Sequence, residues 1–361
     1  MTDTRRHARL MNGAGGPWTA PVRGVLRAAA GIYGWGIDIR NRRFDSGGAA
    51  AYRLPCPVIS VGNLTTGGTG KTPLVIDLLG RLLRRGLRPA VVSRGYRSSA
   101  DGPADEMQIV ADRHESVIRV ADADRVSAGW RACEAGANVI VLDDGFQHRR
   151  LVRDLDFVVV DATCPFGFGY LLPRGLLREP LTALRRADVV VLSRANQVDA
   201  EALAFIRHRL NELAPRALRV VCTHAPSGLT DINGRPVTDM PKRAVLVAGI
   251  GNPGSFANAA RAMGVEPVRT IWRPDHHRYA QRDVNAIANG VRAVDCDAVL
   301  TTEKDAVKLR RLDVRALEPL RVLKVDIEYH PGDAAVVDHA LDGLLVETDR
   351  NGEPAMTAIS T

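Results

Sequence analysis

The sequence predicts an α/β protein built on a parallel sheet. Near-continuous runs of valine, isoleucine and leucine, bounded by turn residues, alternate along the chain with helical patterns. Such runs are typical of buried parallel strands joined by helical crossovers. The 361 residues are enough for two domains, and 45% hydrophobic and 25% charged residues is the composition of a globular protein. This composition excludes a disordered or fibrous protein.

The first apolar run, 58–61, leads into a glycine-rich segment and then into a helical run over 74–79. In a strand, turn and helix of this kind, backbone N–H groups and the helix N-terminus bind phosphate. Lys71 reaches the outer phosphates, and the hydroxyl of Thr72 binds Mg²⁺. The expected nucleotide-binding residues are Thr65, Thr66, Gly67, Gly68, Thr69, Gly70, Lys71 and Thr72.

These residues predict a P-loop that binds a nucleoside triphosphate, although Thr65 replaces the first glycine of the general motif. A glycine-rich turn with a surface lysine is the alternative. The flanking strand and helix patterns favour the P-loop.

Further strands are expected at 89–93, 139–143, 157–161 and 189–193, with helices near 124–134 and 200–213. The strand over 139–143 ends in the paired acids Asp143 and Asp144. A P-loop enzyme needs a carboxylate at the end of a neighbouring strand to hold Mg²⁺, directly or through water. We therefore expect the metal between Thr72 and one of these two acids, and the sequence does not distinguish which is nearer.

A segment rich in turn formers, 226–242, is expected to be a linker, because glycine, asparagine and proline interrupt any apolar periodicity there. Beyond it, strands are expected at 244–248, 268–271, 298–301 and 321–327, with helices near 256–263 and 282–293. The predicted organisation is an N-terminal segment 1–50, a P-loop core domain 51–225, the linker 226–242, a second, smaller α/β domain 243–345 and a disordered tail 346–361.

The N-terminal segment contains a helical pattern over 22–44 with arginines at both ends. Its uncharged run, 28–37, is about half the length that a bilayer-spanning helix requires, and no cleavage site follows a long apolar core. The amphipathic pattern, Tyr33, Trp35 and the flanking arginines are typical of a helix lying in the interface of an anionic membrane. A helix packed on the domain through the same apolar face remains the alternative.

The formal net charge of +8 favours anionic partners such as nucleic acid, acidic lipid headgroups or phosphorylated substrates. Aromatic residues make up only 5% of the chain and do not cluster with arginine, which disfavours a nucleic-acid-binding module. The 5 cysteines form no Cys-x-x-Cys pair, so neither a zinc site nor a disulfide framework is indicated. A reducing cytoplasmic setting fits this pattern best.

Two further motifs have alternative interpretations. The segment 249–254 resembles a dinucleotide fingerprint, but it lacks the acid about twenty positions beyond its strand and contains Pro253, so we interpret it as a tight strand-helix turn. The segment 302–305 resembles a guanine-reading motif at a strand end, which supports an alternative function as a GTP-driven P-loop chaperone or metallocentre insertase. Such proteins usually carry Cys/His ligand clusters, which this sequence lacks.

Five motifs follow one another along the chain: 61–73, Ser93-Arg94-Gly95-Tyr96, 143–148, Asp275-His276-His277 and 302–308. Together, and in this order, they resemble tetraacyldisaccharide 4'-kinase, the lipid A 4'-kinase of Gram-negative bacteria, over about residues 22–330. The resemblance implies a two-domain P-loop kinase that transfers the γ-phosphoryl group of ATP, with Mg²⁺, to the 4'-hydroxyl of a tetraacyldisaccharide 1-phosphate. This acceptor is a glycolipid of lipid A biosynthesis. The resemblance also implies a peripheral protein on the anionic, cytoplasmic face of the bacterial inner membrane.

The resemblance further implies an acid and a histidine that act on the attacking hydroxyl in a cleft between the two domains, which would have to close. The acid carries over to Asp105, in Ala104-Asp105-Glu106, and the histidine to His276, so that the two come from different domains. Lys71 is expected to stabilise charge on the transferred phosphoryl group. Contacts to the substrate or its phosphate are expected from Glu106, Arg125, His148 and Arg178, with Arg174 a further possibility and a surface role open for each arginine.

Overall fold

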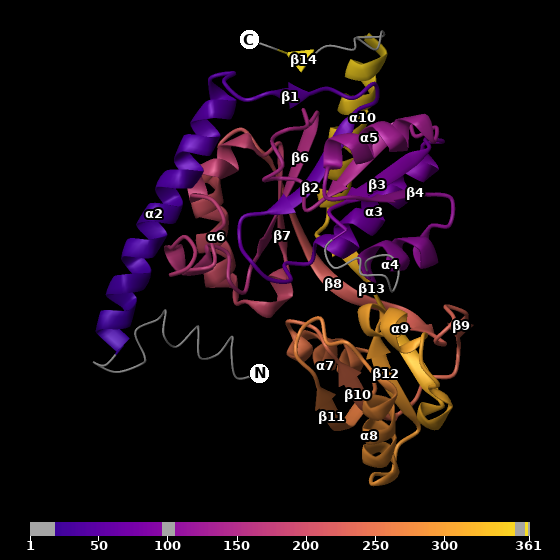
Figure 1. Cartoon of the computed structure of the whole chain (residues 1–361). Coiled ribbons are helices and arrows are strands. Elements are labelled where there is room, and N and C mark those ends of the chain that lie inside the picture. Colours follow the sequence, from indigo (N-terminus) through magenta and orange to yellow (C-terminus); the bar gives the residue numbers. More distant parts are fainter. Residues whose placement is uncertain (1–18, 96–104, 351–357, 360–361) are drawn as a thin grey trace. The chain divides into compact units, whose positions relative to one another are not determined.

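The computed structural model describes residues 19–95, 105–350 and 358–359 (Figure 1). Its contacts divide the chain into two compact units. The larger unit comprises the described residues within 2–101, 116–223 and 328–361, and the smaller unit comprises those within 102–115 and 224–327. The strands β8 (Leu218–Thr230) and β13 (Leu320–Tyr329) each belong in part to both units, because the chain passes from one unit to the other within them.

The larger unit is built on a parallel sheet with the strand order β4-β3-β5-β2-β6-β7-β8. The strands are β2 (Val58–Asn63), β3 (Pro89–Ser93), β4 (Ile118–Ala121), β5 (Val139–Asp143), β6 (Leu155–Asp161) and β7 (Val189–Ser193). From the central β2 the chain first builds the side that contains β3 and later the side that contains β6. Such a reversal places ligand sites at the carboxyl ends of the central strands.

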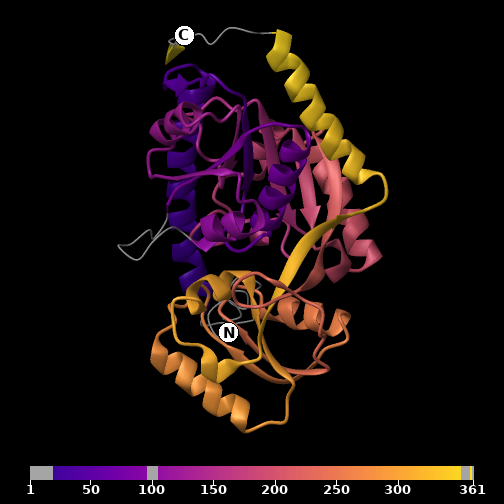
Figure 2. The ribbon, with the colours of Figure 1, turned by 90° about the vertical axis from the view of Figure 1, so that its right-hand side faces the viewer.

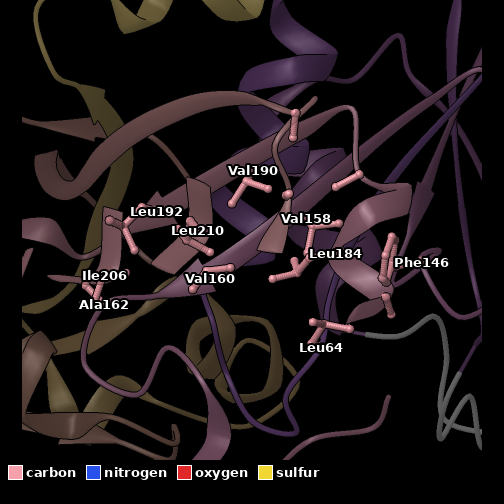
Figure 3. Close-up of a cluster of buried hydrophobic side chains, with 14 of the residues drawn as sticks. Leu64, Phe146, Val158, Val160, Ala162, Leu184, Val190, Leu192, Ile206 and Leu210 are labelled. Atoms are coloured by element: carbon pink, nitrogen blue, oxygen red, sulfur yellow. The ribbon is translucent and has the colours of Figure 1, made fainter. Parts of the chain in front are cut away.

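Helices cover this sheet and complete its core. They are α3 (Lys71–Arg84), α5 (Arg125–Glu134), α6 (Ala200–Leu213) and α10 (Asp333–Arg350), with the short 3-10 helices η1 (Gly167–Gly169), η2 (Leu181–Arg186) and η3 (Ala195–Gln197). Figure 3 shows one buried cluster, in which valines of β6 and β7 and Leu192 of β7 lie with Leu184 of η2 and with Ile206 and Leu210 of α6. A second cluster joins α5 to β3 and β5. The long yellow helix α10 in Figure 2 contacts α3 through the ion pair Arg81–Asp338, 2.7 Å.

In the smaller unit the strand order is β11-β10-β12-β13-β8, and the short β9 (Pro236–Val237) pairs with β8. Its other strands are β10 (Arg243–Ala248), β11 (Glu266–Trp272) and β12 (Ala298–Thr302), and its helices are α4 (Asp105–Arg113), α7 (Pro253–Ala262), α8 (Gln281–Arg292), α9 (Glu303–Leu309) and the 3-10 helix η4 (Arg315–Leu317). Alternate residues of β10 enter two different buried clusters, one with α7 and one with α8, so both faces of the sheet are covered.

Helix α2 (Thr19–Asp45) belongs to the larger unit and has two different faces. Ala30 and Gly34 are buried against the unit, whereas Val25, Ile32 and Trp35 expose 70%, 73% and 69% of their surfaces. Among the described residues, no helix combines the length and the apolar character needed to cross a bilayer. A two-residue pair, β1 (Ala51–Tyr52) with β14 (Ala358–Ile359), completes this unit.

The predicted fold class is confirmed, and each predicted strand and helix has a counterpart in the structure. Among the longer elements of the described residues, β4, α4, β8, α9 and α10 were not predicted. The expected linker contains the end of β8 and all of β9, because Asn233-Gly234 forms the turn of a hairpin, with Gly234 at a φ of 87°. Residues 346–350 are the last turn of α10 and not part of a disordered tail.

The units also differ from the expected domains in their membership. Helix α4 belongs to the smaller unit, although it follows β3 of the larger unit in the sequence. The cause is a set of ion pairs between α4 and the smaller unit: Arg113 contacts Glu303 at 2.6 Å, and Asp112 contacts Arg310 at 2.8 Å. The loop at 98–103, which precedes α4, lies outside the described residues.

A substitution at Gly62 of β2 tests how closely this strand packs against Phe146. A Cβ at Gly62 would lie 2.7 Å from the backbone nitrogen of the fully buried Phe146. Because backbone cannot move aside cheaply, we expect Gly62→Ala to lower the free energy of unfolding by about 1–3 kcal/mol. The control is Gly343→Ala in α10, where a Cβ meets nothing within 4 Å. Chemical denaturation measures both variants, and equal stability of Gly62→Ala and the parent would contradict the packing described here.

Candidate active site

The predicted phosphate loop connects β2 to α3. Gly70 is the N-cap of α3 with a φ of 89°, and Gly67 has a φ of 113°, conformations that favour glycine. Among the described residues, no side chain caps the N-terminus of α3, so the backbone N–H groups of its first turn lack a side-chain cap. This is the arrangement that binds phosphate.

Thr65 takes the place of a glycine without strain. It is not among the residues with positive φ, and it forms an isolated antiparallel bridge with Leu177. The bridge is flanked by two backbone hydrogen bonds: Thr66 N–H donates to the Leu176 carbonyl (2.8 Å), and Arg178 N–H donates to the Leu64 carbonyl (2.7 Å). The start of the loop is therefore extended backbone, which any residue adopts.

The predicted acids lie at the carboxyl end of β5, where Asp143 is the last residue of the strand and Asp144 comes next. Because β5 pairs in parallel with β2, Val61 lies opposite Asp143. The loop and both acids therefore share one edge of the sheet. Asp144 has a φ of 54°, which is uncommon for a residue with a side chain and is often found at functional sites. Its carboxylate contacts Lys71 Nζ at 3.3 Å and Arg178 Nη1 at 2.8 Å.

The electrostatics of this cluster favour an ionised Asp144. Burial alone would raise the pKa of Asp144, but Lys71 and Arg178 outweigh it and hold that pKa below its usual value. Lys71 is also held by Asn63, whose Oδ1 accepts a hydrogen bond of 3.0 Å. Asn63 was not predicted as a site residue, although its place at the end of β2 was a usable signal.

Thr72, Asp143 and Asp144 fit a Mg²⁺ site by their chemistry. All three offer oxygen atoms, and both acids end a strand beside the phosphate loop. Mg²⁺ is usually held by one or two carboxylates together with substrate phosphates and water. A hydroxyl and two carboxylates next to a phosphate loop match that donor set.

Arg125 and Arg178 both reach Asp144, whereas Arg174 does not. Arg125 is 6% exposed and donates to the Asp144 backbone carbonyl at 3.0 Å. Because Arg125 is buried, a surface role is ruled out for it. Arg174 instead lies over the ring of Tyr170, 3.5 Å from its centroid.

His148 belongs to the larger unit and lies in the segment that follows β5 in the sequence. Burial, reinforced by Arg125, lowers the pKa of His148 to about 4, so the imidazole is neutral at pH 7. Its Nε2 is buried and has no hydrogen-bond partner within the part of the chain that the structure describes.

The other predicted catalytic residues lie together in the smaller unit. Asp105 and Glu106 form the acidic first turn of α4, and both face lysines of α9. Lys308 Nζ lies 3.4 Å from Asp105, and Lys304 Nζ lies 3.3 Å from Glu106. The same Lys304 ammonium is 3.3 Å from Nε2 of His276.

Several findings about this cluster were not expected. Asp105 and His276 belong to one unit and not to two different domains, because α4 is held by α9. Glu106, rather than Asp105, shares a lysine with His276. Burial would raise the pKa of Glu106, but Lys304 and other favourable contacts keep it lowered. His276 also has a positive φ, 57°, and its N–H donates to the Gly249 carbonyl at 3.2 Å.

The motif at 302–305 does not read a base. Asp305 is fully buried, and its Oδ2 accepts hydrogen bonds from the Gly249 N–H at 2.9 Å and the Thr302 hydroxyl at 2.7 Å. Thr302 is the N-cap of α9. The segment therefore closes the turn after β10, and Gly249 starts a tight strand-helix turn as predicted.

Comparisons with known proteins agree on one family. A model of the family described as tetraacyldisaccharide-1-P 4'-kinase matches residues 22–345. A protein of Anaeromyxobacter sp. (strain K) named tetraacyldisaccharide 4'-kinase is 40% identical over 352 residues, which cover 91% of this chain and 93% of that protein. A protein of the same name from Geobacter sulfurreducens is 38% identical over 346 residues, covering 89% and 93%.

The solved structure of LpxK from Aquifex aeolicus in complex with ATP is similar along nearly the whole chain. It has a TM-score of 0.68 and 28% sequence identity, and the match covers 91% of this chain and 99% of that one. The alternative of a GTP-driven chaperone or metallocentre insertase is not supported. The chain belongs to the tetraacyldisaccharide-1-P 4'-kinase family, whose members are phosphotransferases that act on a hydroxyl group.

Proposed function

We propose that the chain transfers the γ-phosphoryl group of Mg²⁺-bound ATP to the 4'-hydroxyl of a tetraacyldisaccharide 1-phosphate. The observation that carries the proposal is the uncapped N-terminus of α3 beside Lys71 and the Asp144 carboxylate. The family assignment supports the kinase reaction and its glycolipid acceptor. The solved relative that contains ATP supports the choice of donor.

The proposed reaction is an in-line displacement. The 4'-hydroxyl oxygen attacks the γ-phosphorus, the bond to the oxygen between the β- and γ-phosphates breaks, ADP leaves, and the hydroxyl proton passes to a base. Thr72 with Asp143 or Asp144 would hold Mg²⁺, which would supply positive charge to offset that of the phosphates. Residues 65–72 would bind the phosphates, and Lys71 would leave its pairing with Asp144 to stabilise charge on the transferred group.

The base is assigned to the acids of α4. A carboxylate can take the hydroxyl proton while a second group orients the hydroxyl, and we assign these roles to Asp105 and His276. Lys308 beside Asp105 and Lys304 beside His276 hold the two groups in place. The contact between Lys304 and Glu106 makes Glu106 the competing candidate for the base.

Arg125, Arg178 and His148 are the proposed contacts to phosphate or substrate. The two arginines bring positive charge to the edge of the sheet where the loop lies. His148, with a pKa of about 4, would act as a neutral hydrogen-bonding group and not as a cation. Its buried and unpartnered Nε2, judged on the described residues, is available for such a contact.

The exposed face of α2 is proposed to lie in the interface of an anionic membrane, on the cytoplasmic side where the acceptor is held. Val22, Val25, Ile32, Trp35 and Ile39 recur at helical spacing and are exposed by 48%, 70%, 73%, 69% and 42%. Arginines flank this stripe at both ends. An exposed apolar stripe with flanking cations is typical of interfacial helices.

Lys71→Ala tests the phosphate loop. We expect kcat to fall by at least about a hundredfold, because an ammonium that stabilises the transferred group is lost. A kinase assay with labelled ATP, Mg²⁺ and tetraacyldisaccharide 1-phosphate measures the effect, and the exposed Lys242→Ala is the control. A folded Lys71→Ala protein with near-normal turnover would refute the assignment.

The acid and the histidine are tested as a pair. We expect Asp105→Ala and His276→Ala each to lower kcat by about 10²–10⁴-fold with little change in ATP affinity. The double variant should resemble the more damaged single variant, because cooperating groups lose their effect together. Gln108→Ala, on the same helix, is the control. Multiplying losses would show independent roles, and a silent Asp105→Ala with a damaged Glu106→Ala would assign the base to Glu106.

The membrane assignment is tested with vesicles that contain anionic phospholipid. Replacing both Ile32 and Trp35 by serine removes two large apolar side chains from the proposed contact, and we expect binding to weaken by about tenfold or more. Phe205→Ser on α6 is the matched control, since Phe205 is 59% exposed but lies outside the stripe. Equal loss in both variants would contradict a specific role of α2.

A further inference from the structure

The inward face of α2 makes polar contacts with a short segment of the larger unit, Leu176–Glu179. The Tyr33 hydroxyl donates to the Arg178 carbonyl at 2.9 Å. Arg40 and Asn41 donate to the Glu179 carboxylate at 3.1 Å and 3.0 Å. These contacts are separate from the exposed apolar face of the same helix.

Glu179 makes these contacts energetically important. Its side chain is fully buried, and its charge is met by Arg40 and Asn41 of α2 and by Arg186, at 2.9 Å. A buried carboxylate is tolerated only when it is paired and hydrogen-bonded, and the loss of one partner is strongly unfavourable. The helix thus supplies two of the three side chains that allow Glu179 to remain in place.

The other side of the segment holds the phosphate loop. Leu176 and Arg178 exchange backbone hydrogen bonds with Thr66 and Leu64, and Leu177 forms the bridge with Thr65. The guanidinium of Arg178 contacts both carboxylate oxygens of Asp144, at 3.0 Å and 2.8 Å. One residue, Arg178, therefore touches α2 through its carbonyl, the loop through its N–H and the predicted metal site through its side chain.

We propose that α2 is part of the nucleotide site, in which Tyr33, Arg40 and Asn41 are positioning residues that act through Leu176–Glu179 on the phosphate loop and on Asp144. This inference rests on the proposed binding of ATP at that loop. It adds a second role to the helix, because its contacts support ATP binding even where no lipid is present. A displaced α2 loosens the loop and leaves Arg178 free to move away from Asp144.

The test is the affinity of the full-length protein for Mg²⁺-ATP in lipid-free detergent solution, measured by calorimetry. Tyr33→Phe removes one hydroxyl, and Asn41→Ala removes one partner of Glu179. Each lost hydrogen bond is expected to raise the Kd by about three- to tenfold. Asp38→Asn, at an exposed position of the same helix, is the control and should leave the Kd unchanged.

Hydrogen exchange provides the second measurement, since it reports loop order without any ligand. In Tyr33→Phe, the amides of Thr66 and Arg178 should exchange faster than in the parent, while amides of β7 should not change. Parent-like Kd values and parent-like exchange in both variants would overturn the inference. If the parent itself fails to bind Mg²⁺-ATP, the proposed function fails, whereas faster exchange in Tyr33→Phe would still support the positioning role.

Discussion

The ion pairs of Asp144 with Lys71 and Arg178 are the interaction on which the candidate site depends. They exist because β2 and β5 are neighbours in a parallel sheet, so the phosphate loop after one strand and the acids after the other meet at the same edge. The positive φ of Asp144 turns its side chain at the strand end. The Asp144 carboxylate balances the charges of Lys71 and Arg178, and we propose that bound phosphates compete with it for Lys71.

Local sequence signals predicted most of the strands and helices of the larger unit. They failed for elements whose position depends on contacts between residues far apart in the sequence. The buried runs at 89–93, 139–143 and 189–193 are strands with the expected bounds, because continuous Val/Ile/Leu runs have few other solutions. Helix α9 was not predicted, because it follows β12 without a break and is largely charged. The membership of α4 depends on Arg113 and Glu303, which are 190 positions apart in the chain, and no local pattern reveals such a pair.

In the candidate site, too, local motifs predicted some residues, and others are recognised only from the structure. Lys71, Thr72 and the acids after β5 were predicted from motifs, whereas Asn63, Glu179, Lys304 and Lys308 were not singled out as site residues. Each of these four matters only through a partner that is distant in the sequence or through its burial. The same holds for α2, whose pattern left membrane contact and packing as alternatives. The structure gives the helix one exposed apolar face and one face bound to the domain, so the two alternatives are not exclusive.

A crystal structure with a non-hydrolysable ATP analogue and Mg²⁺ tests the central claim most directly. We expect phosphates against the N–H groups of 67–72, a metal between Thr72 and the acids at the end of β5, and Lys71 moved from Asp144 to a phosphate oxygen. A nucleotide bound elsewhere, or one bound at the loop while Lys71 stays paired with Asp144, would contradict it.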